Sequence, residues 1–210
     1  MEGKASQSGT VSGPAAAKRE VRRMIRERVG GLDAAAREAA FSTRNRRIGV
    51  IGTAATIRSR SYEALLRRLV PGVEITARPC PLFVPLVEAG YVDHSAPDKQ
   101  EITKLVIAQY LTEIRDAGVD TLILGCTHYP LLTDIIREIM GPEVSLVNAG
   151  AESVHTLRDA LARRQLLAPE GTGQALLCTS DRPEGFGQMA RRFLQEEPTA
   201  PVRLVDIERY

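Results

Sequence analysis

The sequence predicts an α/β protein in which a parallel sheet is flanked by helices. Short apolar or β-branched runs alternate along the chain with longer stretches whose apolar residues recur at helical spacing. The run at residues 121–124 is almost wholly apolar and ends at Gly125, which is typical of a strand covered on both faces. Glycine, proline or asparagine stands at most boundaries between these runs, as expected of turns.

The composition narrows the function classes. The chain has 210 residues, enough for one large or two small domains. Its net charge of +2 argues neither for nor against a nucleic-acid partner, but without tryptophan a base-stacking surface is not expected. Cys80, Cys126 and Cys178 lack metal-ligand spacing, which favours a reduced, cytoplasmic protein without disulfides or metal. Neither a signal-peptide core nor a bilayer-spanning run is present, so no membrane partner is expected.

The amino-terminal part is expected to lie outside the main domain. Residues 1–13 are small, polar and glycine-rich, which predicts a disordered tail. Residues 14–46 predict a helical extension: a basic amphipathic helix up to residue 30, then an alanine-rich helix over residues 32–41. The basic face could contact nucleic acid, but acidic residues interrupt its charge, so a solvated face is favoured.

Residues 47–150 are expected to form one complete α/β domain. Four runs in this range have the length and the β-branched character of strands. The expected strands are residues 47–51, 73–77, 121–124 and 144–147, and the expected helices run through Leu69, over residues 102–117 and from Pro130 to residue 140. The helix at 102–117 is expected to carry Leu105, Val106, Gln109 and Ile114 near one side.

Two threonines follow the first strand at the turn into its helix. Gly52 permits a tight turn, and Thr53 and Thr56 can either cap the helix or bind a small anion. Position alone favours capping. The segment is not a phosphate loop, because the glycine–lysine pattern of such loops is absent.

A proline-rich segment follows the second strand. Three prolines within residues 79–85 argue against a strand or helix interior and predict a rigid apolar loop carrying one carboxylate, Glu88. A surface position is the alternative for Glu88. For Cys80, burial as a small apolar side chain is favoured. Residues 91–100 are polar and are expected to form a surface insertion.

A thiol, a hydroxyl and an imidazole lie between the strand ending at Gly125 and the helix beginning at Pro130. Ligands bind beyond the carboxyl ends of strands in open α/β sheets. The helix amino terminus would favour an anion there, either a bound carboxylate or the Cys126 thiolate. By residue type alone, Cys126 could equally be a buried structural cysteine, and His128 a packing or capping residue.

Three segments of the sequence resemble those of glutamate racemases, in the aspartate/glutamate racemase family. They are Gly-Val-Ile-Gly-Thr-Ala-Ala-Thr at 49–56, Cys-Pro-Leu-Phe-Val-Pro-Leu-Val-Glu-Ala-Gly at 80–90, and Leu-Gly-Cys-Thr-His-Tyr-Pro at 124–130. Their order and spacing fit the family, and the resemblance extends from about residue 29 to residue 210.

The resemblance implies a cofactor-independent, cytoplasmic enzyme that interconverts L- and D-glutamate for peptidoglycan synthesis. Such enzymes have two α/β domains facing across a cleft, and each domain supplies one cysteine to one face of the substrate. The resemblance leaves a homo-oligomer open and implies no metal. It assigns Cys126 as the second cysteine, Thr127 and His128 as substrate-contacting and proton-assisting residues, Glu88 as the acidic support of that histidine, and Thr53 and Thr56 as pocket-lining residues.

The sequence also departs from the family pattern. The Asp-Ser-Gly, Pro-Tyr-Gly and Cys-Asn-Thr motifs of the family's first half do not occur before Arg47, and Asn148 begins a turn where aspartate is usual. Residues 151–210, with strands at 175–179 and 202–206 around a helix at 186–194, are therefore expected to belong to an incomplete second domain with open strand edges. We thus expect one complete and one incomplete domain, as in a truncated racemase.

Two readings of the function remain. In the first, the chain is a glutamate racemase that uses Cys126; in the second, it is a catalytically impaired remnant that binds a small dicarboxylate or a partner protein. A second catalytic thiol distinguishes them, because the racemase needs one on the other face of the substrate. Cys80 and Cys178 are the only other cysteines in the sequence that could take this role. A racemase for aspartate or a hydantoin is a third, weaker option.

Overall fold

The computed structural model describes residues 31–93, 96–171, 175–197 and 201–209, together with the single residues Ala16 and Arg19. The predicted tail at residues 1–13 lies outside the described residues. The predicted basic helix before residue 31 also lies outside them, apart from Ala16 and Arg19.

The centre of the fold is a four-stranded sheet in the order β2-β1-β3-β4, and every neighbouring pair is parallel. Gly52 lies beside Pro79 on one side and Gly125 on the other, so the carboxyl ends of three strands meet at one edge. This arrangement confirms the predicted fold class. The strands are β1 (Arg47–Gly52), β2 (Glu74–Pro79), β3 (Thr121–Gly125) and β4 (Ser145–Asn148).

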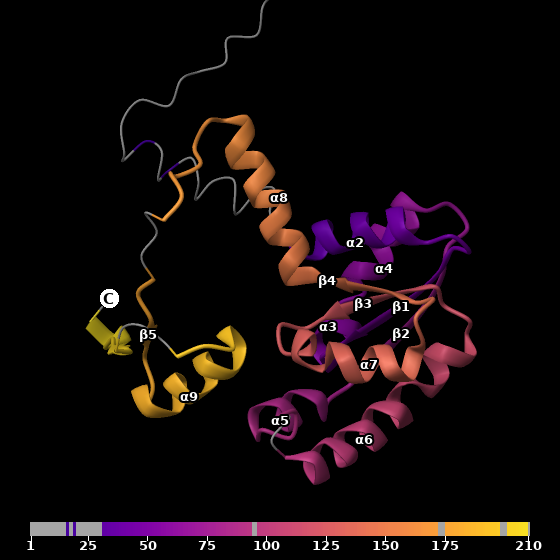
Figure 1. Cartoon of the computed structure of the whole chain (residues 1–210). Coiled ribbons are helices and arrows are strands. Elements are labelled where there is room, and N and C mark those ends of the chain that lie inside the picture. Colours follow the sequence, from indigo (N-terminus) through magenta and orange to yellow (C-terminus); the bar gives the residue numbers. More distant parts are fainter. Residues whose placement is uncertain are drawn as a thin grey trace, which may run out of the picture.

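Helices cover both faces of this sheet (Figure 1). On one face lie α2 (Gly31–Ser42) and α4 (Ser61–Leu69), and on the other lie α5 (Phe83–Glu88), α6 (Pro97–Asp116) and α7 (Thr133–Met140). Helix α8 (Ala149–Arg163) begins at the end of β4, packs against α2 and runs away from the sheet (Figure 1). The side chains of β3 alternate between the two layers: Ile123 packs with the first layer, and Leu122 and Leu124 pack with the second. The central strands are therefore buried on both sides, as their apolar sequence predicts.

The helix predicted to run through Leu69 is divided. Thr53 caps a short helix, α3 (Ala54–Arg58), and α4 begins only after Arg60. Arg60 has a φ of 51°, in the left-handed region, which breaks the helical path between the two.

The loop predicted for the proline-rich segment is wrong in its second half, because residues 83–88 form α5. Pro85 lies in the first turn of this helix, where a backbone amide would have no helical partner, so proline is tolerated. The predicted face of α6 is also wrong in part. Leu105 is 72% exposed, and the buried side is formed by Thr103, Ile107, Leu111 and Ile114.

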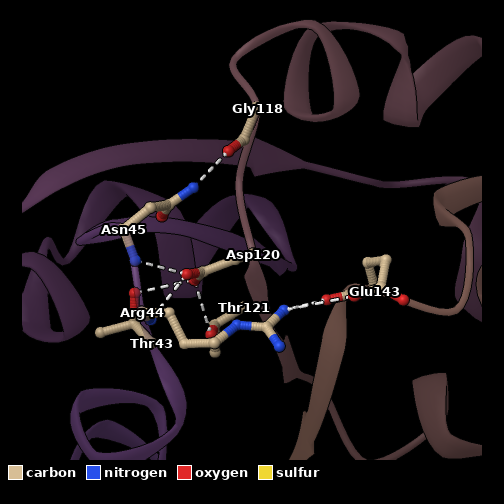
Figure 2. Close-up of polar contacts among 7 residues, drawn as sticks. All are labelled: Thr43, Arg44, Asn45, Gly118, Asp120, Thr121 and Glu143. Atoms are coloured by element: carbon tan, nitrogen blue, oxygen red, sulfur yellow. Dashed lines mark hydrogen bonds and ion pairs between the residues drawn. The ribbon is translucent and has the colours of Figure 1, made fainter.

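A buried carboxylate fastens the opposite edge of the sheet (Figure 2). Asp120, just before β3, accepts hydrogen bonds from Thr43 Oγ1 at 2.7 Å, from the amides of Arg44 and Asn45 at 2.6 Å each, and from Thr121 Oγ1 at 3.0 Å. Burial alone would raise the pKa of Asp120, but these hydrogen bonds outweigh it and hold the pKa below its ordinary value. The α2–β1 connection is thereby tied to the start of β3.

The carboxyl-terminal segment begins at residue 164, and the residues that the structure describes in it form no comparable core. Its strands β5 (Cys178–Thr179) and β6 (Arg203–Leu204) are shorter than predicted and pair in parallel, and α9 (Pro183–Leu194) connects them. No residue that the structure describes beyond Ala160 is buried. A short helical turn, η2 (Ile207–Arg209), follows β6. None of the helices in the described ranges has the length and apolar character needed to cross a bilayer.

Candidate active site

The candidate site begins where β3 ends. A Cβ added to Gly125 would lie 2.7 Å from the Ile51 carbonyl oxygen of the neighbouring strand, closer than side chains tolerate. Glycine therefore allows the chain to leave the sheet edge close to β1. The next three residues, Cys126, Thr127 and His128, follow directly at this edge.

Tyr129 anchors this loop in the core. Its ring is fully buried and packs edge-on against Phe83, with centroids 5.1 Å apart, and its hydroxyl donates to the Cys80 carbonyl oxygen at 3.0 Å. Burial raises the pKa of the Tyr129 phenol, so it stays protonated as a hydrogen-bond donor. The Tyr129–Leu132 turn (η1) then leads into α7. Loop residues before Tyr129 are thus held at the edge by a rigid anchor.

The thiol, the imidazole and one carboxylate form a chain. His128 Nδ1 lies 3.9 Å from Cys126 Sγ, and His128 Nε2 lies 3.2 Å from Glu88 Oε1 at the end of α5. Thr127 Oγ1 is 3.3 Å from the same Nδ1. A carboxylate on one ring nitrogen orients the ring so that the other nitrogen faces the thiol. All four are predicted site residues, and the structure brings them together.

Cys126 and Thr127 also line a pocket of about 660 Å³, which is within the size range of small-molecule sites. Its described lining contains no charged side chain. Residues from α2, the α3–α4 region, the β3 loop and the start of α8 form it. They are Gly31, Leu32, Ala55, Thr56, Ser59, Ser61, Tyr62, Gly125, Cys126, Thr127, Pro130, Asn148, Ala149 and Gly150.

The two predicted pocket threonines behave differently. Thr56 lines the pocket, whereas Thr53 is not among the lining residues. Thr53 Oγ1 accepts the Thr56 amide at 3.2 Å and lies 2.9 Å from Thr56 Oγ1, so it caps α3, as its position alone favoured. Thr53 thus contacts the lining residue Thr56 without being a lining residue itself.

Several lining residues were not predicted. Leu32 enters the pocket because α2 packs beside α8, a contact that leaves no local signal in the sequence. Ser61 is there because the helix breaks at Arg60. Asn148, noted only as a departure from the family pattern, caps α8 by accepting the amides of Gly150 at 3.0 Å and Ala151 at 3.2 Å.

The other two thiols lie elsewhere. Cys80 is fully buried, and burial raises its pKa to about 12 although Arg78 acts in the opposite direction, which confirms the apolar role favoured for it. Cys178 is exposed in β5 and is not a lining residue. Of the three cysteines, Cys126 alone lines the pocket in the part of the chain that the structure describes. The same part holds no group of three or more potential metal ligands.

Comparisons with known proteins agree on one family. The family model described as Asp/Glu/Hydantoin racemase matches residues 28–157. The glutamate racemase of Geobacter metallireducens is 45% identical over 167 residues, covering 79% of this chain and 60% of that protein. The glutamate racemase of Chlorobaculum parvum is 39% identical over 170 residues, covering 80% of this chain and again 60% of the relative. The chain thus spans about 60% of the length of these curated relatives.

Solved structures give the same result. Glutamate racemase isoform RacE1 from Bacillus anthracis superposes with a TM-score of 0.76 at 28% identity, covering 91% of this chain and 71% of that one. A glutamate racemase from Francisella tularensis, in complex with D-glutamate, gives a TM-score of 0.72 at 29% identity and covers 86% of this chain and 64% of that one. The fold of the present chain therefore matches part of the length of both structures.

Proposed function

Because the chain belongs to the Asp/Glu/hydantoin racemase family, we propose that it is a cofactor-independent racemase that interconverts L- and D-glutamate. Its relatives from G. metallireducens and C. parvum are glutamate racemases, which supports glutamate over the family's other substrates. One observation carries the proposal: Cys126 lines the pocket and also lies beside the His128–Glu88 pair. Following the resemblance, the D-glutamate would serve peptidoglycan synthesis.

Racemisation breaks the Cα–H bond on one face and forms a new one on the other. In the proposed reaction the Cys126 thiolate takes the proton from Cα, and the electron pair of that bond moves into the adjacent carboxylate group. A cysteine thiol in water has a pKa of about 8.5 and is mostly protonated at pH 7, so a neighbouring group must assist formation of the thiolate. His128 Nδ1, 3.9 Å from the sulfur, accepts the thiol proton, and Glu88 stabilises the imidazolium that results.

Substrate recognition would depend on neutral donors. Because the described lining holds no charged side chain, the two carboxylates of glutamate would be bound by hydroxyl and amide groups. Thr127 and Thr56, which line the pocket together with Cys126, supply hydroxyls in the proposed complex. The start of α8, at Ala149 and Gly150, also lines the pocket, and the amino terminus of a helix of this length favours an anion.

Inversion requires a second acid on the opposite face of Cα. Cys80 is buried and Cys178 lies outside the pocket lining, so neither is placed for this role. In the proposed racemisation a water molecule in the pocket therefore protonates Cα on the opposite face, and the hydroxide that remains takes the proton from the Cys126 thiol. Without such a water, Cys126 can still remove the Cα proton and return one to the same face. In D₂O that step exchanges hydrogen for deuterium and keeps the configuration, so exchange can occur without racemisation.

The test is D-glutamate formation from L-glutamate by the purified full chain, followed by chiral chromatography. We expect turnover that disappears in Cys126→Ala and persists in Cys178→Ala, the matched removal of an exposed thiol outside the pocket. D-Glutamate formation at the wild-type rate by Cys126→Ala would contradict the proposal.

A second candidate is a binding protein for small dicarboxylates that does not invert them. The observation that favours it is the single thiol in the described pocket lining, because a racemase of this type needs an acid or base on each face. This function predicts that L-glutamate raises the thermal unfolding midpoint of the wild-type chain while no D-glutamate forms. Turnover in the chromatographic assay excludes it.

A further inference from the structure

Two consecutive residues of α9 contact the His128–Glu88 pair from the carboxyl-terminal segment. The Phe193 ring packs edge-on against the His128 ring, with centroids 5.1 Å apart and an interplanar angle of 85°. Arg192 Nη1 donates to the Glu88 carbonyl oxygen at 2.8 Å. Both members of the pair are thus held by a helix that lies outside the sheet layers.

The Phe193 contact acts on the orientation of the imidazole. An imidazole can rotate about its bond to Cβ, and only one orientation points Nδ1 at Cys126 while Nε2 meets Glu88. An edge-to-face neighbour stabilises one ring orientation. Glu88 is 51% exposed in its side chain, so its bond to His128 competes with water and gives only partial control. Phe193 therefore adds a constraint that the exposed carboxylate lacks.

The Arg192 contact acts on the end of α5. Glu88 is the last residue of this helix, and a cation at a helix carboxyl terminus binds carbonyl oxygens that lack helical partners. Arg192 Nε also pairs with Asp93 at 3.5 Å. Gly90, at a φ of 75°, leaves room for the guanidinium, because a Cβ there would lie 2.7 Å from Arg192 Nη2. The guanidinium thus joins α5 to the turn that follows it.

We propose that Phe193 and Arg192 are positioning residues, which hold His128 and Glu88 so that the imidazole faces the Cys126 thiol. The inference rests on the proposed function, since it assigns the pair a role in proton transfer. Two side chains of the carboxyl-terminal segment then position residues of the candidate active site, although the segment contributes no residue to the pocket lining.

The first measurement is Cα-proton exchange of L-glutamate in D₂O by the full chain. Phe193→Ala should lower kcat about threefold to tenfold and leave KM unchanged, because the ring does not line the pocket. Phe193→Tyr, which keeps the ring edge, should restore kcat to within about twofold. The matched control is Phe186→Ala, on the same helix and equally exposed at 36% against 37%, which should leave kcat unchanged.

The arginine has a neighbour that serves as its control. Arg192→Gln should lower kcat about threefold, the scale of one charge-assisted hydrogen bond near the surface. Arg191→Gln should have no effect, because Arg191 pairs with Glu197 within its own segment. Equal losses in the two arginine variants, or a change in KM alone, would overturn the inference.

The second measurement does not depend on activity. Alkylation of Cys126 by iodoacetamide at pH 7, quantified by peptide mass spectrometry, should be about threefold slower in Phe193→Ala and unchanged in Phe186→Ala. Phe193→Leu keeps apolar bulk at this position and guards against loss of folding, and it should give an intermediate rate. An unchanged or faster rate in Phe193→Ala overturns the inference. If the wild-type chain exchanges no glutamate proton but alkylation slows as expected, only the proposed function fails.

Discussion

The sheet layers and the carboxyl-terminal segment are built from similar residue types but reach different degrees of packing. Every buried apolar residue in the described chain lies between Ala34 and Ala160. In the segment from residue 164 onward, Leu176, Leu204 and Ile207 are 61–67% exposed. This difference indicates that an alternating pattern of strands and helices is sufficient to form secondary structure. A buried core also requires several longer strands paired side by side.

The largest difference between the two regions should appear on truncating a leucine in each. Leu122→Ala in β3 removes a fully buried side chain that lies with Ile114 of α6 against Gly49 of β1, and should cost about 2–5 kcal/mol of unfolding free energy. Leu204→Ala in β6 should cost less than about 0.5 kcal/mol, because that side chain is 61% exposed. Urea unfolding of both variants measures this. Equal losses would mean that the segment has a core of its own.

Asp120 should give the next largest effect. Asp120→Asn keeps the shape but removes the charge that four donors share, and should cost about 1–3 kcal/mol at pH 7. Since the folded pKa is depressed, this stability is present above the ordinary aspartate value of about 3.9 and is lost as pH falls through the folded pKa. The difference in unfolding free energy between Asp120→Asn and the wild type should therefore become smaller below about pH 4. A pH-independent gap would contradict this origin.

A smaller effect is expected at the cap of α3. Thr53→Ala should cost about 1 kcal/mol, because the Thr56 amide loses its acceptor. Thr179→Ala in the carboxyl-terminal segment removes a similar bond, to the Asp181 amide at 3.1 Å, and should change the global unfolding free energy by less than about 0.3 kcal/mol. Thr53→Ser keeps the oxygen and should restore stability. A raised KM in Thr53→Ser would indicate direct substrate contact instead of capping.

Much of the sheet could be predicted from the sequence because each strand carries its own apolar run. The loop of the candidate site could also be predicted, because Cys126, Thr127 and His128 lie between a strand and a helix at the carboxyl edge of the sheet. Glu88 could be predicted as a site residue only from the family resemblance. Its contact with His128 depends on α5, and the prolines of that segment predicted a loop.

The contacts that escaped prediction are those made over long sequence separations. Leu32 reaches the pocket through packing of α2 against α8, and Phe193 reaches His128 from a segment whose local pattern indicates only a helix. In neither case does the local sequence indicate which distant residue the side chain contacts. Predicted strands in the carboxyl-terminal segment came out short for the related reason that pairing, more than propensity, decides strand length.

Proton exchange at Cα tests the central claim, that one thiol at the carboxyl edge of the sheet moves the Cα proton of glutamate. With L-glutamate in D₂O, the wild-type chain and Cys178→Ala should both introduce deuterium at Cα, observed as loss of the Cα proton signal by NMR, and Cys126→Ala should introduce none. Exchange by Cys126→Ala at the wild-type rate, or no exchange by the wild-type chain, would contradict the account.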